Sequence, residues 1–418
     1  MNRQSGPFAA MGVLFFMIGF ITVLNDILVP HMKSLFDLNY TQAALIQFSF
    51  FTAYFVIAFP SSWLISRLGY QRSIVAGLVI SALGTCSFYP ASILQSYPMF
   101  LGGLFTLASG FALLQTALNP YVAVLGPPES SSARLALAQA LNSVGTTLAP
   151  LLGAMVILGG HMLSSAEVAA LESGAREAYR ASQSESVQVP YALLTAMLAA
   201  LAVGVAYLKL PTITAVEGEE ERSVSFLAPL RMPHLRKGMI GIFAYVGAEV
   251  GIGSFMVSYL QERSGITEAT GATYVAMYWG GAMVGRFVGS YLLTRLNPSK
   301  LLGAMAVVNV ILTASSTVLS GMTAAYALIA CGLFNSIMFS TMFTLSIKDL
   351  GAMTNKGSSW LIAAILGGAI IPAVQGAIAD MSGSLVWSYL LPTACYIYIA
   401  YYGFRGSHSS VSRSPSAV

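Results

Sequence analysis

Long apolar segments recur along the whole chain, and short polar stretches separate them. A helix needs about 20 mainly apolar residues to cross the roughly 30 Å of hydrocarbon in a bilayer. Segments of that length fall into two sets of six, and the pattern therefore predicts an all-α membrane protein with twelve transmembrane helices in two six-helix domains. The segments are residues 8–30, 41–66, 73–94, 98–125, 135–160 and 190–210, then 238–261, 269–294, 301–321, 323–347, 357–379 and 385–404.

Two polar gaps are longer than the others. Residues 161–189 are rich in Ser, Ala and Glu, and residues 211–237 contain the acidic run between Glu217 and Glu221. The second gap bisects the chain and is interpreted as a cytoplasmic linker. We therefore expect an N-terminal six-helix domain over residues 1–210 and a C-terminal six-helix domain over residues 238–418, which includes a short cytoplasmic tail.

The two halves of the chain resemble each other in sequence. Phe59–Leu68 aligns with Phe287–Leu296 at an offset of 228 residues, and Gly145 corresponds to Gly367 at an offset of 222. Many transporters are built from internal repeats of this kind. The alignment predicts two parallel repeats of six helices, related by pseudo-symmetry.

Composition and charge agree with a membrane protein. The 418 residues are 56% hydrophobic and 9% charged, with a mean hydropathy of +0.73, whereas soluble domains carry roughly a quarter charged residues. With loops assigned to alternate sides, sixteen Lys and Arg residues, Arg286 among them, fall on one side and four on the other. Because cytoplasmic loops carry the excess of Lys and Arg, we expect both termini in the cytoplasm. The net charge of +4 is interpreted as topology, with no nucleic-acid partner.

Several classes of function lack their motifs in this sequence. Cys86, Cys331 and Cys395 lie in apolar stretches without metal-ligand spacing, so we expect small core residues, with no disulfide framework and no zinc site. The four histidines fall in predicted loops or tails, and neither a GxxxxGK[ST] loop nor a GxSxG nucleophile motif occurs. We therefore expect no enzyme, no metal site, no ATP-driven pump and no cofactor other than a coupling ion.

Two carboxylates lie well inside predicted spans, Asp26 in the first and Glu249 in the seventh. A charged side chain at the centre of a membrane helix costs about 2.5–3.5 kcal/mol on insertion scales, so a carboxylate there needs a polar cavity, a partner or a function. Each of these spans is the first of its half, and pseudo-symmetry would place the two carboxylates on opposite walls of one central cavity. The alternative is that either acid only hydrogen-bonds a neighbouring helix and stabilises the bundle.

Neutral amides and aromatic residues add candidates for solute binding. Gln115 and Asn119 are spaced i,i+4, and Gln139 and Asn142 are spaced i,i+3, so each pair projects from one side of its helix. Amides donate and accept hydrogen bonds, which suits sugar hydroxyls, although an interhelical hydrogen bond is an equal alternative for any one of them. Aromatic rings offer a surface for the apolar face of a pyranose, but many face lipid or pack between helices. The candidate substrate-binding residues are Asn25, Gln47, Gln115, Asn119, Gln139, Asn142, Glu249, Tyr278, Trp279, Asn335 and Trp360, and the candidate cation-coupling residues are Asp26 and Glu249.

At these residues the chain resembles the major facilitator superfamily, and within it the bacterial glucose/galactose transporter branch of the fucose:proton symporter family. The likeness covers nearly the whole chain and is carried by Asn25–Pro30, Leu114–Tyr121, Ala138–Ser143, Tyr245–Ser254 and Gly285–Gly289. It implies a major facilitator fold, a bacterial inner-membrane location and a monosaccharide substrate.

The resemblance also bears on the coupling residues. In fucose symporters one carboxylate in helix 1 and another in helix 4 carry protonation. Asp26 matches the first, but Gln115 stands at the helix 4 position, and Glu249 stands where fucose symporters carry Gln in helix 7. One ionisable group has thus changed halves, which departs from the fucose symporter's coupling scheme.

The sequence therefore predicts a hexose symporter that works by alternating access. We expect Asp26 to bind the coupling proton or sodium ion, the amides to hold sugar hydroxyls, and Glu249 either to bind sugar or to share the coupling charge. Glucose or galactose is the expected substrate, with N-acetylglucosamine or fucose as alternatives. An uncoupled sugar uniporter and a non-transporting membrane sensor are the alternatives in mechanism. The expected partners are a monosaccharide and the lipid bilayer, and we expect a monomer.

Overall fold

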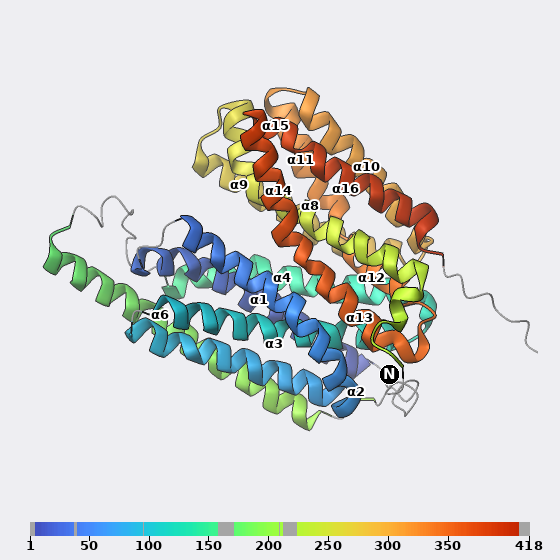
Figure 1. Ribbon diagram of the computed structural model, residues 1–418, viewed down its shortest axis with the longest axis horizontal. Coiled ribbons are helices and arrows are strands. Elements are labelled where there is room, and N and C mark those ends of the chain that lie inside the picture. The colour runs from blue at the N-terminus through green and yellow to red at the C-terminus, as the bar shows by residue number, and fades with distance from the viewer. Residues whose placement is uncertain are drawn as a thin grey trace, which may run out of the picture. The chain divides into compact units, whose positions relative to one another are not determined.

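The computed structural model describes the backbone of residues 5–36, 40–94, 96–157, 171–208, 210–211 and 224–408. Within these residues every regular element is a helix (Figure 1). The first half of the chain forms α1 (Ser5–Phe36), α2 (Tyr40–Ile93), α3 (Tyr97–Val124), α4 (Ser131–Ile157) and α6 (Ser173–Tyr207). The second half forms α8 (Pro233–Ser264), α9 (Glu268–Leu292), α10 (Pro298–Val318), α11 (Gly321–Asn335), α12 (Met338–Ile347), α13 (Thr354–Ala363), α14 (Gly367–Ser382), α15 (Leu385–Ser388) and α16 (Leu390–Tyr401).

The helices confirm the all-α prediction, but their ends differ from the predicted spans. Among the described residues, seven helical stretches are long and apolar enough to cross a membrane. One of them, Phe48–Ile93, has 46 residues, which at about 1.5 Å per residue is more than twice the thickness of the hydrocarbon core. This stretch takes in two predicted spans, and Gly69 interrupts its helical geometry with φ 75°, a value that glycine adopts readily.

Two further differences concern predicted gaps and spans. α6 begins at Ser173 and therefore includes part of the polar stretch that was predicted to lie between spans. Conversely, the single span predicted over residues 323–347 is divided into α11 and α12, with Ser336 and Ile337 between them. Hydropathy shows which residues can lie in the hydrocarbon of the bilayer. It does not show where a helix begins, ends or is interrupted, and this explains both differences.

Equivalent contacts within each half support the predicted repeat. The Thr195 hydroxyl donates to the Thr85 hydroxyl at 2.9 Å, and the Thr393 hydroxyl donates to the Thr313 hydroxyl at 2.9 Å. Thr85 and Thr313 are 228 residues apart, the offset of the aligned segments. The same interhelical hydrogen bond has thus formed in both halves.

The aligned segments and the paired glycines show the same correspondence. The Arg67 guanidinium lies 4.4 Å from the centre of the Trp63 ring, and Arg295 lies 5.7 Å from that of Tyr291 at the equivalent positions. A Cβ atom on Gly145 would collide with the backbone carbonyl of Phe16, and one on Gly367 with that of Phe243. Small residues let membrane helices approach closely, so each glycine brings its helix against the first helix of its own half.

Contacts between residues divide the chain into two compact units. One unit comprises Ala9–Leu118 and Leu141–Pro211, and the other comprises Met1–Phe8, Asn119–Ala140 and Thr212–Val418. The second unit therefore includes the end of α3 and the start of α4, which belong to the first half of the sequence. The division into domains at residues 1–210 and 238–418 stays a prediction.

Polar and apolar contacts hold residues 119–140 within the second unit. The hydroxyls of Ser132 in α4 and Thr344 in α12 are 2.6 Å apart, and both side chains are buried. Beside them lies a buried apolar cluster formed by Ala133, Ala136, Leu293 and Ile337. This cluster and hydrogen bond join the start of α4 to the end of α9 and to α12.

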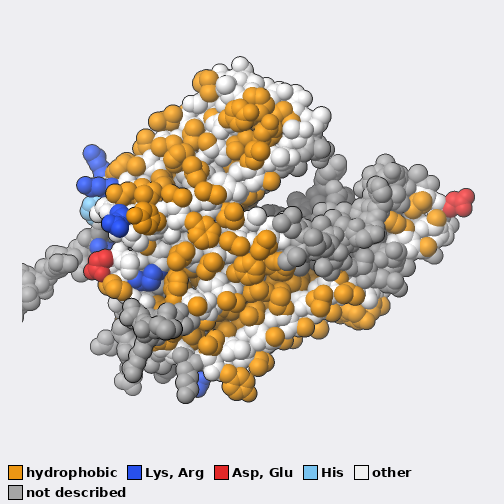
Figure 2. Space-filling view, turned by 180° about the vertical axis from the view of Figure 1, so that it is seen from behind, with side chains coloured by type: hydrophobic (Ala, Val, Ile, Leu, Met, Phe, Trp, Pro, Cys, Tyr) orange, Lys and Arg blue, Asp and Glu red, His pale blue; other side chains and the backbone are white. Residues whose placement is uncertain are grey.

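The surface is apolar over large areas. Figure 2 shows a face covered mainly by hydrophobic side chains, with Lys and Arg gathered toward one edge. Large apolar side chains are exposed, Met381 at 89% and Val318 at 76%, as expected for surfaces that contact lipid. Cys331 and Cys395 are buried as predicted, but Cys86 is exposed, so the prediction of a core position for Cys86 is wrong. All three are free thiols.

Candidate functional site

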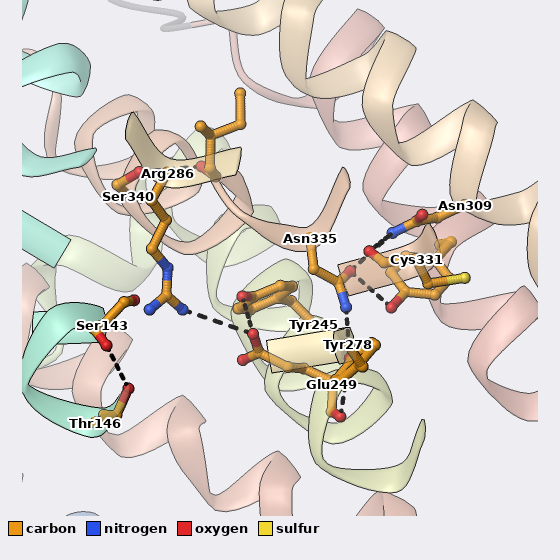
Figure 3. A network of polar contacts seen from close by, with 12 residues as sticks. Ser143, Thr146, Tyr245, Glu249, Tyr278, Arg286, Asn309, Cys331, Asn335 and Ser340 are labelled. Carbon is orange, nitrogen blue, oxygen red and sulfur yellow. Dashed lines mark hydrogen bonds and ion pairs between the residues drawn. The ribbon is translucent and has the colours of Figure 1, made fainter. Parts of the chain in front are cut away.

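A buried ion pair lies at the centre of the polar residues in the second unit. Glu249 of α8 accepts a hydrogen bond on Oε1 from the hydroxyl of Tyr245, one turn earlier, at 2.8 Å. Nη2 of Arg286 in α9 lies 3.7 Å from the same oxygen (Figure 3), and the two charged side chains are 11% and 15% exposed. A charge buried without a partner is costly in protein and lipid alike, so the guanidinium compensates the carboxylate.

Arg286 is a site residue that the sequence interpretation missed. The charge count treated it as a loop cation, but it lies inside α9 with its side chain largely buried. The prediction for this residue is therefore wrong, and the imbalance of loop cations is smaller by one. Arg286 is the single charged residue in the predicted span 269–294. The rule that selected Asp26 and Glu249 would have selected it as well.

A chain of hydrogen bonds continues from Glu249 into the helix bundle (Figure 3). The hydroxyl of Tyr278 donates to the backbone carbonyl of Glu249 at 3.2 Å and accepts from Nδ2 of Asn335 at 2.8 Å. Oδ1 of Asn335 accepts from Nδ2 of Asn309 at 2.8 Å and from the hydroxyl of Tyr396 at 2.7 Å. A hydrogen-bonded network in a low-dielectric interior rigidifies its members, and here Oδ1 of Asn309 is left without a partner among the described residues.

The network connects α8, α9, α10, α11 and α16. The structure thus brings together three predicted site residues, Glu249, Tyr278 and Asn335. Asn309 and Tyr396, which were not predicted, complete the network, and both are 0% exposed. Asn309 is an amide inside an apolar span, the signal that identified the other amides.

The two predicted tryptophans lie in different surroundings. The Trp279 ring meets the Tyr278 ring edge-on, with centroids 5.1 Å apart, and also lies against Gly253 of α8. The indole N–H of Trp360 donates to the backbone carbonyl of Phe226 at 3.1 Å. Trp279 therefore borders the Glu249 network, whereas Trp360 contacts the segment before α8. Their role as stacking surfaces for sugar stays a prediction.

Two predicted amides of the first half form interhelical hydrogen bonds. Nδ2 of Asn142 in α4 donates to the backbone carbonyl of Phe15 in α1 at 2.9 Å, and Nε2 of Gln115 in α3 donates to the hydroxyl of Tyr54 in α2 at 3.0 Å. These are the contacts that the alternative interpretation expects for amides in membrane helices. Both bonds use the N–H groups of the amides.

Asn119 differs from the other amides. Its side chain is 0% exposed, and neither its Nδ2 nor its Oδ1 has a hydrogen-bond partner among the described residues. Each unsatisfied buried polar group costs about 1–3 kcal/mol, so this amide favours the binding of a polar group beside it. Gln139 of α4 is half-buried.

Three predicted residues lie outside the described side chains, namely Asn25, Asp26 and Gln47. The assignment of Asp26 to cation coupling therefore rests on the sequence. Among the described residues, no group of three or more His, Cys, Asp or Glu side chains could hold a metal ion. His234, predicted in a loop, is buried in the first turn of α8, with Nε2 2.9 Å from the backbone carbonyl of Lys348; the loop prediction for His234 is wrong.

Comparison with known proteins identifies close relatives over nearly the whole chain. A family model described as Major Facilitator Superfamily matches residues 11–372. A glucose/galactose transporter of Brucella abortus is 45% identical, over 96% of this chain and 94% of its own length. A putative glucose/galactose transporter of Helicobacter pylori is 42% identical, over 97% and 98%. The L-fucose-proton symporter of Escherichia coli is 36% identical, over 94% and 91%.

Solved structures give the same result at the level of the fold. The transporter FucP in its outward conformation superposes with a TM-score of 0.90 at 35% identity, covering 96% of this chain and 99% of that chain. The proton:xylose symporter XylE superposes with a TM-score of 0.71 at 13% identity, which extends the likeness in fold alone.

Proposed function

The chain belongs to the major facilitator superfamily, and on this premise we propose that it is a secondary active transporter that takes up a hexose together with a proton or a sodium ion. Glucose or galactose is the proposed substrate, because two relatives with those names match nearly the full length of the chain at 45% and 42% identity. The protein is a multi-pass membrane protein. We propose a bacterial inner membrane as its location, with both termini in the cytoplasm.

The observation that carries the proposal is the buried network around Glu249. Two amides and three tyrosine hydroxyls, joined through five helices, hold the carboxylate of Glu249 inside an apolar protein, and Glu249 is the member of the network that is partly exposed. Hydroxyl-rich solutes need such acceptors, and transporters of this kind bind their substrate near the middle of the bilayer. Alternating access would then expose the site to each side of the membrane in turn.

The proposed roles follow from the chemistry of the side chains. Asp26 would bind the coupling cation, since it is the acid that matches the helix 1 carboxylate of fucose symporters. Gln115, Asn119, Gln139 and Asn142 would hold sugar hydroxyls from the first half of the chain. Glu249 would contact the sugar from the second half.

A fucose symporter is the second candidate, and the 36% identity to the E. coli L-fucose-proton symporter favours it. Gln115 and Glu249 depart from the fucose symporter pattern, and for this reason hexose is preferred. N-acetylglucosamine stays an alternative substrate. A symporter differs from a uniporter in that its sugar uptake depends on an ion gradient. A membrane sensor would differ from both because it would not transport sugar.

The proposal is tested by sugar uptake into proteoliposomes with imposed gradients. The unaltered protein should accumulate labelled glucose or galactose when an inward proton or sodium gradient is present. Asp26→Asn should lose accumulation and keep sugar exchange, because the amide cannot take up and release a proton. Asp380→Asn, at an exposed position on α14, is the matched control and should accumulate normally. Full accumulation by Asp26→Asn would remove Asp26 from coupling, and no uptake or exchange of any hexose by the unaltered protein would overturn the proposed function.

A further inference from the structure

The proposed function has one coupling step, but two acids, Asp26 and Glu249, lie inside predicted spans. Glu249 differs from Asp26 in that it forms an ion pair with Arg286 of α9. We infer that Arg286 holds Glu249 permanently ionised, so that Glu249 is a fixed acceptor for sugar hydroxyls and takes no part in proton or sodium coupling. The inference rests on the proposed function and deepens it. It assigns Arg286 as a positioning residue and Glu249 as a residue that determines specificity.

The carboxylate has one oxygen engaged and one available. Oε1 receives both the Tyr245 hydroxyl and the Arg286 guanidinium, whereas Oε2 has no partner among the described residues. Tyr245, Tyr278 and Asn335 are at most 1% exposed, while Glu249 is 9% exposed. Glu249 is therefore the most exposed of these residues, and its Oε2 atom is the acceptor that a solute hydroxyl can reach.

The network behind Glu249 fixes the direction of the carboxylate. Tyr278 holds the backbone carbonyl of Glu249, and Asn335 holds Tyr278. A fixed acceptor can distinguish sugars that differ in one hydroxyl, because a site built to bind that hydroxyl leaves a buried polar group unpaired when the hydroxyl is missing.

The groups packed around Glu249 include one cation, the guanidinium of Arg286. Besides Tyr245 of its own helix, Arg286 and Tyr278 of α9 and Tyr396 of α16 interact with it electrostatically, and of these Arg286 alone carries a charge at neutral pH. α11 contributes the buried thiol of Cys331 and the neutral amide of Asn335, and α14 meets α8 with the neutral Gln375 at Gly251.

Apart from Tyr245, the other ionisable groups of α8 lie toward the two ends of the helix, and the nearest of them, Tyr259, is ten residues from Glu249, about 15 Å along the helix. His234, which contacts Lys348, is fifteen residues before Glu249, about 22 Å along the helix at 1.5 Å per residue. The guanidinium is thus the near group that sets the charge of the carboxylate.

The test measures sugar affinity of the purified protein across pH, together with the ratio of ions to sugar transported in proteoliposomes. Glu249→Gln should weaken glucose or galactose binding by about tenfold or more, since hydrogen bonds to a charged group are the strong ones. The loss should be equal at every pH, and the ion-to-sugar ratio should not change. Among deoxy sugars, the analogue that lacks the bound hydroxyl should lose no further affinity in Glu249→Gln.

Substitutions at Arg286 should change the pH dependence of sugar affinity, which a merely structural role would not produce. In Arg286→Gln the unpaired carboxylate should take up a proton as the pH falls, so that sugar affinity acquires a further pH dependence, absent from the unaltered protein, and decreases toward acid. Arg286→Lys keeps the charge and should not introduce this dependence. The double variant Glu249→Gln/Arg286→Gln should bind sugar weakly without the new pH dependence. It also leaves no unpaired buried charge, which guards against failure to fold.

The outcomes separate this inference from the proposed function. If the unaltered protein binds no sugar, both fail. If it binds sugar and the variants with Gln at position 249 bind equally well, only the inference fails. An altered ion-to-sugar ratio in Glu249→Gln, with unchanged sugar affinity, would make Glu249 a coupling residue and would overturn the inference.

Discussion

Asn309 is a buried member of the network behind Glu249 that the sequence interpretation missed. Its Nδ2 donates to the Asn335 oxygen that also receives Tyr396, and its side chain is 0% exposed. A buried amide at this position in an apolar helix is costly unless it is bonded. The residue therefore has a structural task, which is to hold Asn335 and through it Tyr278.

Asn309→Ala should destabilise the protein by about 1–3 kcal/mol, because it removes a buried hydrogen bond and leaves a cavity. Tyr396→Phe removes the other donor to the same oxygen without a large change in volume, so it should cost about 1 kcal/mol. Thermal unfolding in detergent, with and without sugar, measures both. A variant Asn309→Ala with unaltered stability and unaltered sugar affinity would contradict this role.

Most of the site residues could be found from the sequence at the residue scale, because polar side chains are rare inside apolar spans. Glu249 and Asn335 are predicted in that way, whereas Tyr278 is predicted as an aromatic surface for sugar. The sequence could not show which polar side chains contact one another across helices. The partner of Arg286, Glu249, lies on another helix and 37 residues earlier in the chain, so the sequence does not show that the two side chains meet. A prediction of pairs needs the register between helices.

At the scale of the elements, the end of α3 shows how a helix terminus is satisfied within the protein. The Arg134 guanidinium donates to the carbonyls of Val122 at 3.2 Å, Ala123 at 2.5 Å and Pro127 at 2.8 Å. The last carbonyls of a helix have no partners within the helix, and one planar guanidinium here serves several of them.

Arg134→Lys should therefore lower stability by about 1–3 kcal/mol, because an ammonium cannot reproduce the fixed fork of the guanidinium. Arg231→Lys, at an exposed position in the short helix Ala228–Arg231, is the matched control and should leave stability unchanged. Equal melting temperatures for the two variants would contradict the role of Arg134.

The number and order of the apolar segments could be predicted at this scale, and the helix ends could not. Gly69 marks a break in α2 that hydropathy placed correctly in a loop. The break between α11 and α12 lies inside one apolar run, where hydropathy is uniform and gives no signal. The first residues of α6 are helical but polar, so hydropathy did not identify them as part of a helix.

At the scale of the whole molecule, residues 119–140 join the second unit although they belong to the first half of the sequence. The hydrogen bond between Ser132 and Thr344 and the adjoining apolar cluster hold them there. If transport proceeds by alternating access, contacts between segments of different halves must separate in one of the two states. We expect this contact to open during each transport cycle.

A disulfide between cysteines at these two positions should lock the contact. In a background from which the three native cysteines are removed, Ser132→Cys/Thr344→Cys should lose transport on oxidation and regain it on reduction, while sugar binding persists. Each single cysteine variant serves as control and should be insensitive to oxidation. Undiminished transport by the fully cross-linked protein would show that the contact does not open.

The central claim, that the protein binds and transports a monosaccharide in a manner coupled to an ion, is tested most directly by equilibrium binding to the purified protein. Glucose, galactose, fucose and N-acetylglucosamine would be measured with and without sodium and across pH. We predict binding of glucose or galactose with an affinity that depends on pH or on sodium. Binding that is insensitive to both would contradict the coupling, and no binding of any of the four sugars would contradict the substrate class itself.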